Sequence, residues 1–212
     1  MPPKIQFTRD DVLAAAFRIT RQQGLEAVNA RAVAKALGCS TQPLFRAFHS
    51  MDEIRTEMLR MAGDVYAANL LRCGELSPKP YLGSGLAYLQ LAREEPQLFR
   101  LLFMRDREMD GTQQQVDPTM DFVLSLVMQS TGLSREQARQ FHLHLWVYVH
   151  GLATMIATHF VTLPPEEAER MLSQQYHAVR RLFNLPDWAE REAGVPDPTS
   201  PAGQLPPDQK PE

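Results

Sequence analysis

The fold is decided by the tetrapeptide Leu37-Gly38-Cys39-Ser40, which interrupts a helical pattern running from Thr8 to Ile54. Gly adopts the left-handed backbone conformation without steric cost, so Gly38 is a natural helix end. A helix, a tight turn that contains Gly and a second short helix form a helix-turn-helix, whose second helix enters the major groove of DNA. Residues 8–54 therefore predict a three-helix DNA-binding head.

Capping residues mark where the first two helices of this stretch begin and end. Thr8 and Asp11 have the spacing of a capping box, with Asp in place of the usual Glu. Gly24 is suited to end the first helix. Asn29 can cap a second helix, which continues to the break at Gly38.

The third helix is expected to begin at Ser40, whose hydroxyl can cap it, and to carry Pro43 in its first turn, where a missing N–H group costs little. Leu44 and Phe48 would form its buried side. Residues 50–53 form a full Ser-x-x-Glu capping box and open the next helix. Each of these helices is too short to be stable alone, so they must share one hydrophobic core.

The charge of the chain is unevenly distributed. The 212 residues are 44% hydrophobic and 22% charged, as in an ordinary globular protein, and carry a net charge of −3. Residues 1–50 hold seven Lys and Arg against three Asp and Glu, a net charge of +4, so the remainder carries −7. A basic head on an acidic body suits a protein that contacts phosphate with one end only.

The cysteine content and hydropathy indicate a cytoplasmic protein. The two cysteines, Cys39 and Cys73, cannot build a disulfide framework or a Cys-rich zinc site. No N-terminal segment resembles a signal peptide, and no apolar run is long enough for a membrane span, so no membrane partner is expected. Cys39 lies in the turn, but we favour a small buried filler over a redox switch because nothing else indicates a reactive thiolate.

Beyond Ser50 the pattern is helical almost throughout, and no alternating strand pattern is found. Residues 105–116 are polar and are expected to form a loop. The expected helices span about residues 52–72, 81–94, 96–104, 117–131, 134–160 and 166–183.

Composition divides the chain into three parts. Residues 1–51 form the DNA-binding head, and residues 52–184 form a helical domain. Seven of the 16 prolines lie in residues 185–212. Such a segment cannot bury enough apolar surface to offset its ordering entropy, so we expect a disordered tail.

Three groups of residues resemble the TetR family of transcriptional regulators, over roughly residues 8 to 183. The third group also resembles the Trp…His-Gly signature of one TetR subgroup. The groups are, in chain order, Gly24, Val33-Ala34, Gly38-Cys39-Ser40, Leu44-Phe45, Phe48 and Met51-Asp52-Glu53-Ile54; the run from Tyr88 to Phe103; and Trp146 with His150-Gly151-Leu152.

The resemblance implies an all-α protein in which a three-helix helix-turn-helix domain precedes a helical ligand-binding and dimerisation domain. It further implies a homodimeric regulator, a repressor of a palindromic double-stranded DNA operator that is released by a small apolar effector. No cofactor is expected. Two positions depart from the family pattern: Phe45 stands where Tyr is usual, and Met51 where Lys is usual. Both usual residues contact phosphate, so weaker phosphate binding is expected.

Residues expected to contact DNA lie at the start of the first two helices and along the third. Gln42 can read adenine bidentately, and Arg46 can bind guanine or phosphate. Arg31 and Arg9 are phosphate candidates beside helix N-termini. The full set is Arg9, Arg31, Ser40, Thr41, Gln42, Phe45, Arg46, His49 and Ser50.

The effector is expected to bind among the helices after Ser50. Met and aromatic side chains there can line an adaptable pocket, although at helical spacing they more often form core. The candidates are Tyr66, Tyr88, Phe103, Met104, Phe122, Trp146, His150 and Met155. His142, His144 and His150 do not have the i, i+4 spacing of a helical metal site, so no metal is expected.

The last two helices carry wide apolar faces, and in family members the equivalent helices pair with their copies in a dimer. Gly151 is expected to let another helix approach closely. The apolar residues in question are Leu143, Trp146, Val147, Ile156, Met171, Leu172, Tyr176, Val179 and Leu182.

Two other function classes compete with this interpretation. The departures at Phe45 and Met51 are compatible with an all-α small-molecule-binding protein whose DNA-binding head is weakened or lost. An enzyme is disfavoured, because no Ser-His-Asp, paired-carboxylate or phosphate-loop pattern is found.

Overall fold

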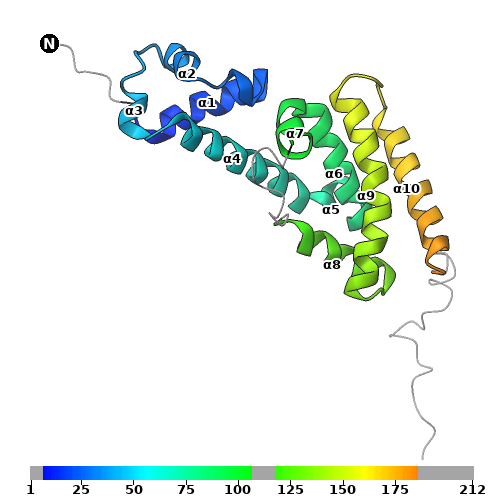
Figure 1. Ribbon diagram of the computed structural model, residues 1–212. Helices are drawn as coiled ribbons and strands as arrows, with labels where there is room; N and C mark the ends of the chain where they lie inside the picture. Colours follow the sequence, from blue (N-terminus) through cyan, green and yellow to red (C-terminus); the bar gives the residue numbers. More distant parts are fainter. Residues whose placement is uncertain (1–6, 107–117, 186–212) are drawn as a thin grey trace, which may run out of the picture.

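The computed structural model describes residues 7–106 and 118–185, and over these residues it contains helices and no strand (Figure 1). The predicted all-α architecture is confirmed. The predicted loop falls mostly on residues 107–117, and the predicted tail almost entirely on residues 186–212, outside the described residues. The helices are α1 (Arg9–Gln23), α2 (Ala30–Leu37), α3 (Leu44–Ala47), α4 (Met51–Leu71), α5 (Cys73–Leu76), α6 (Pro80–Glu94), α7 (Pro96–Phe103), α8 (Met120–Thr131), α9 (Arg135–Ala157) and α10 (Pro165–Leu182).

Local capping signals place the ends of α1 and α2 as predicted. Thr8 and Asp11 form a complete capping box at the start of α1. Gly24 ends α1 with φ of 87°, and the Asn29 side chain accepts a hydrogen bond from the backbone of Ala32. Gly38 ends α2 in the left-handed conformation, with φ of 67°. A short 3-10 turn follows Gly24, which the sequence analysis did not predict.

The third helix is shorter than predicted. It covers only Leu44–Ala47, and Ser40 does not cap it. The Leu44 N–H group instead donates to the carbonyl of Thr41, so residues 41–43 form a turn before the helix. Phe48 ends it in an extended conformation, with φ of −136°. Pro43 therefore precedes the first turn, because the turn hydrogen bond delays the start of the helix.

The Ser50 cap is present, but its reciprocal half differs from the prediction. The Ser50 hydroxyl accepts from the Glu53 N–H group at 3.2 Å. The Glu53 carboxylate accepts from the His49 N–H group at 2.8 Å and from Arg9 at 2.8 Å. These bonds lower the pKa of Glu53, the His49 backbone contributing most.

The core of the head extends past the predicted boundary at residue 51. Val12, Val33 and Leu44 from the three head helices are fully buried, as are Ile54 and Met58 from α4. The first two turns of α4 therefore belong structurally to the head.

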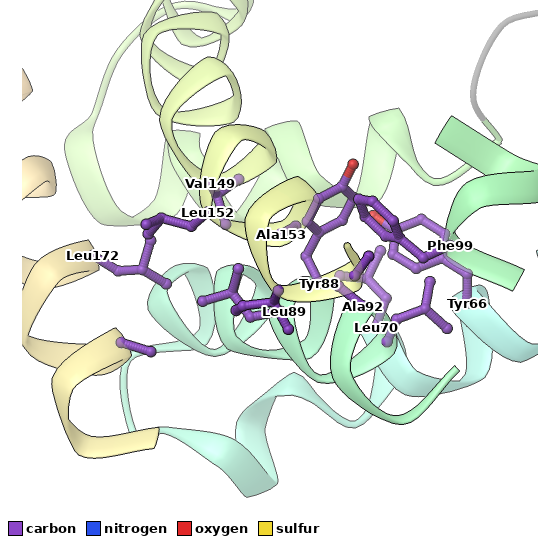
Figure 2. Close-up of a cluster of buried hydrophobic side chains, with 14 of the residues drawn as sticks. Tyr66, Leu70, Tyr88, Leu89, Ala92, Phe99, Val149, Leu152, Ala153 and Leu172 are labelled. Carbon is purple, nitrogen blue, oxygen red and sulfur yellow. The ribbon is translucent and has the colours of Figure 1, made fainter. Parts of the chain in front are cut away.

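The body is built around α6, which lies against α4, α8, α9 and α10. Its core contains Tyr66 of α4, Tyr88 of α6, Phe99 of α7 and Leu172 of α10. In Figure 2, Tyr66 and Phe99 lie at one side of this cluster and Leu172 at the other. The short helix α5, which the sequence analysis also missed, packs against α6.

The head and body also meet through α7, which packs on the C-terminal part of α1. Leu98 and Leu101 of α7 are buried in a cluster with Ala62 of α4, and Phe17 of α1 packs against it. Beside this cluster the Arg21 guanidinium forms an ion pair with Glu95. The head is thus held to the body at two places, along α4 and across α1–α7.

Two helical glycines differ in the space around them, so substitution by Ala should affect stability in opposite directions. An added Cβ at Gly83 in α6 would lie 2.1 Å from the backbone oxygen of Cys73, whereas one at Gly63 in α4 meets nothing within 4 Å. We expect Gly83→Ala to lower the free energy of unfolding by about 1–3 kcal/mol through overpacking. Gly63→Ala should raise it by roughly 0.5–1 kcal/mol through helix propensity. Chemical denaturation of both variants measures the difference, and equal effects would contradict the close α5–α6 contact.

Candidate nucleic-acid interface and effector cavity

The segment from Ser40 to Ser50 presents a largely polar surface to solvent. Ser40, Gln42, Arg46, His49 and Ser50 are exposed, and Thr41 is half-buried. Leu44 and Phe48 point into the core, as predicted for this segment. The exposed residues include amide, hydroxyl and guanidinium groups, which can bond to base edges and phosphates.

Two of the three arginines predicted to contact DNA are available for it. Arg31 at the start of α2 and Arg46 in α3 are exposed and make no ion pair or side-chain hydrogen bond with the described residues. Arg9 differs, because its guanidinium bonds to Glu53 at 2.8 Å and to the Ala47 carbonyl at 3.1 Å.

The surroundings of Arg9 give it an internal role. A second ion pair joins it to Glu57 at 3.5 Å, and its guanidinium lies 4.0 Å from the centre of the Phe48 ring. Cation–π contact and paired carboxylates both favour this position. Arg9 therefore links α1 to the end of α3 and the start of α4, and a phosphate contact from Arg9 would compete with these bonds.

The two residues that depart from the family pattern have different environments. The Phe45 side chain is 50% exposed on α3. Met51 is half-buried and packs against the core of the head. Phe45 thus keeps an aromatic ring at the surface without a hydroxyl group, while Met51 contributes packing without charge.

A cavity of about 1060 Å³ lies in the body, lined by residues of α4, the α5–α6 connection, α6, α8, α9 and α10, with the end of α7. Its inner wall is aromatic and aliphatic, including Tyr66, Leu70, Tyr88, Phe103 and Val149. Sites for small molecules are commonly concave and mostly apolar with a few placed polar groups. This cavity has that character.

Two Tyr–His pairs join α6 to α9 at the cavity. The Tyr81 hydroxyl lies 3.0 Å from His142 Nδ1, and the Tyr88 hydroxyl lies 2.9 Å from His150 Nδ1. Burial raises the pKa of Tyr81, and burial lowers the pKa of His150. The lowered pKa favours the neutral form of His150, whose Nδ1 shares one hydrogen bond with the Tyr88 hydroxyl, as expected for a hydrogen-bonded packing residue.

The structure separates the eight predicted effector residues into two groups. Four line the cavity: Tyr66, Tyr88, Phe103 and Trp146. The other four do not line it: Met104 is exposed at the end of α7, Phe122 and Met155 pack against the core, and His150 is bonded to Tyr88. Residue type and helical spacing are the same in both groups, so they could not be distinguished in the sequence.

Several polar residues that line the cavity were not predicted as effector residues, notably Tyr81, His142, Ser173 and Tyr176. One signal was present in the sequence. Tyr81 and Tyr88 recur two turns apart on α6, and His142 and His150 recur at nearly the same interval on α9. Matching periods of complementary polar groups on two helices can indicate cross-helix hydrogen bonds.

No group of three or more His, Cys, Asp or Glu side chains in the described residues is arranged to hold a metal ion. None of the described helices combines the length and apolar character that crossing a membrane requires.

Two family models match the chain at the positions of these two sites. The model of bacterial regulatory proteins of the tetR family matches residues 12–58, which hold the head. The model of the tetracyclin repressor-like C-terminal domain matches residues 82–179, which hold most of the cavity. The chain belongs to the TetR family. It is therefore a transcriptional regulator with a helix-turn-helix DNA-binding domain, not an enzyme.

Solved structures share this TetR fold. A TetR-like transcriptional regulator from Rhodococcus sp. RHA1 superposes with a TM-score of 0.62 at 16% identity, over 86% of this chain and 98% of the other. A second transcriptional regulator from the same organism gives a TM-score of 0.59 at 22% identity, over 82% and 97%. No curated protein matches the sequence.

The different surroundings of Arg9 and Arg46 predict different effects on stability. Arg9→Ala removes ion pairs and a ring contact, and should lower the free energy of unfolding by about 1 kcal/mol. Arg46→Ala removes an exposed side chain without an internal partner, so its effect should stay within about 0.5 kcal/mol. Denaturant titration of both variants measures this, and equal losses would refute the internal role of Arg9.

Proposed function

We propose that this TetR-family protein is a homodimeric repressor that acts in the cytoplasm on a palindromic operator and is released by a small apolar effector. The observation that carries the DNA-binding half is the exposed surface of residues 40–50 with the available cations Arg31 and Arg46. These groups supply both base-edge and phosphate contacts. They also offer a means of compensating for the charge and hydroxyl missing at Met51 and Phe45.

The effector half rests on where the cavity lies. Its lining includes Tyr66 and Leu70 of α4 and Phe103 of α7. Helix α4 enters the core of the head, and α7 packs on α1 beside the Arg21–Glu95 ion pair. A ligand that favours one arrangement of these helices would therefore shift the position of the head.

Selection of bound DNA from a random pool tests the proposal. We expect a palindromic sequence whose binding weakens steeply with salt, as for any protein that neutralises phosphates. Arg46→Ala should weaken binding to the selected site about tenfold or more. Arg18→Ala, which removes an exposed arginine of α1, is the matched control and should change binding little.

Failure to select any sequence would overturn the proposal. In that case the double variant Phe45→Tyr with Met51→Lys decides whether the protein is a ligand-binding protein with a lost DNA-binding head. Gain of DNA binding by this variant would support that alternative.

The dimer is proposed to form through α9 and α10. Leu143 and Val147 of α9 are 56% and 62% exposed, and Gly151 continues the same stripe at four-residue spacing. On α10, Ala178 is exposed and Leu182 is 63% exposed. Such apolar side chains on two neighbouring helices are expected to be covered by a partner, and a symmetric pair of reading heads fits a palindrome.

The proposed dimer face leaves out three residues of the predicted one. Ile156, Leu172 and Val179 are buried within the protein itself and are removed from the predicted set. An added Cβ at Gly151 meets nothing within 4 Å, so no helix of the same chain approaches it closely. We propose that Gly151 instead allows a helix of the second subunit to approach closely.

A charge placed in the stripe should separate the subunits. Val147→Glu buries an unpaired carboxylate in the proposed interface, so sedimentation should show a dimer for the natural protein and a monomer for this variant. Leu71→Glu is the control, because Leu71 is 69% exposed on α4, which is not a helix of the proposed interface. A monomeric natural protein, or a Val147→Glu variant that stays dimeric, would exclude this interface.

A further inference from the structure

The cavity of the body has two chemically different ends. At one end, the rings of Tyr66, Tyr88 and Phe103 contact one another, with centroids 4.8–6.0 Å apart. At the other end, Tyr81 lies 6.0 Å from Tyr176 of α10, measured between ring centroids. In Figure 2, Tyr66 lies at one side of the buried cluster and Leu172 of α10 at the other.

The distance between the ends follows from α6. Tyr81 and Tyr88 are seven residues apart on this helix and both line the cavity. With a rise of 1.5 Å per residue, the two positions are roughly 10 Å apart along the helix axis. A ligand that occupies both ends is therefore elongated.

The α10 end holds a hydroxyl group prepared to donate a hydrogen bond. Tyr176 lines the cavity, and its hydroxyl oxygen accepts from Arg180 Nη1 at 3.2 Å. Arg180 is fully buried behind it. The Tyr176 hydroxyl donates to none of the described residues, so its hydrogen is available to the cavity. A hydroxyl that accepts from a cation is polarised and becomes a stronger donor.

The aromatic end offers no such donor from Tyr88, since its hydroxyl is engaged with His150. Leu70 and Phe103 complete an apolar wall there. An apolar group loses least on entering this end, because it gives up no hydrogen bond to water.

We infer that the effector is an elongated amphipathic molecule whose apolar body fills the Tyr66–Phe103 end and whose acceptor oxygen, a carbonyl or carboxylate, bonds to the Tyr176 hydroxyl. The inference deepens the proposed function by naming the ligand class and its direction in the cavity. The apolar body lies against α4 and α7, the helices that contact the head, and the polar group lies against α10.

Three probes of equal chain length test the inference on the full-length protein: 2-decanone, decanoate and decyltrimethylammonium, each below its aggregation concentration. Binding is measured by thermal shift and by tryptophan fluorescence, to which Trp146 at the cavity contributes. We expect the ketone or the carboxylate to bind at least about tenfold more tightly than the ammonium compound, and their order reports whether the preferred oxygen carries charge. Equal binding of all three, or preference for the ammonium compound, would overturn the inference.

A variant assigns the effect to one hydroxyl group. Tyr176→Phe keeps the ring and should weaken binding of the preferred probe about tenfold while leaving the ammonium compound unchanged. Tyr148→Phe is the matched control, since Tyr148 packs against the core and does not line the cavity. If loss of the Arg180 contact destabilises Tyr176→Phe, the comparison of probes on the natural protein still decides. If the protein selects an operator but binds the three probes equally, this inference is refuted and the proposed function still stands.

Discussion

One buried stripe on α4 determines how the two halves of the protein are joined. Ile54, Met58, Ala62, Tyr66 and Leu70 recur at four-residue spacing, and all are buried. The first two belong to the head core, Ala62 to the α1–α7 junction, and the last two to the body core. Because four residues exceed one helical turn, each step moves the stripe about 40° around the helix, so it swings by roughly 160° from end to end. One rigid helix can thus be buried by the head on one side and by the body on the other.

The contact between α7 and α1 is a second connection between the head and the body. A helix shared by two cores can transmit a displacement only if it packs tightly in both. The packing of α7 on α1 also connects the two parts directly. The Arg21–Glu95 ion pair lies at that junction and raises the pKa of Arg21. Arg21 is half-exposed, so its ion pair contributes little to stability. The apolar contacts of Leu98 and Leu101 stabilise the junction more.

Polar contacts also connect the helices that line the cavity. The Tyr81–His142 and Tyr88–His150 pairs hold α6 and α9 together while satisfying polar groups that burial would otherwise penalise. Tyr176 and the buried Arg180 add a polar wall on the α10 side. The proposed dimer helices α9 and α10 carry His142 and Tyr176 of the polar end. Helices α4 and α7, which contact the head, carry Tyr66 and Phe103 of the apolar end.

The sequence by itself determined the helical class, the helix-turn-helix and most helix ends, because these depend on local contacts. Thr8 and Asn29 cap their helices as predicted, and Gly38 has the positive φ that the break requires. The start of α3 was predicted wrongly because a local turn at residues 41–43 competed with capping by Ser40.

Only the tertiary structure decided which chemically similar side chains have different roles. Arg9 and Arg46 are both arginines at the head, yet Arg9 is held by Glu53 and Phe48 while Arg46 is exposed and forms no ion pair with the described residues. Tyr66 lines the cavity while Met155 packs against the core, although both lie on apolar helical faces. Helical period tells which residues are buried, but whether they border a core or a cavity depends on the shape of the facing helices, which no local sequence pattern contains.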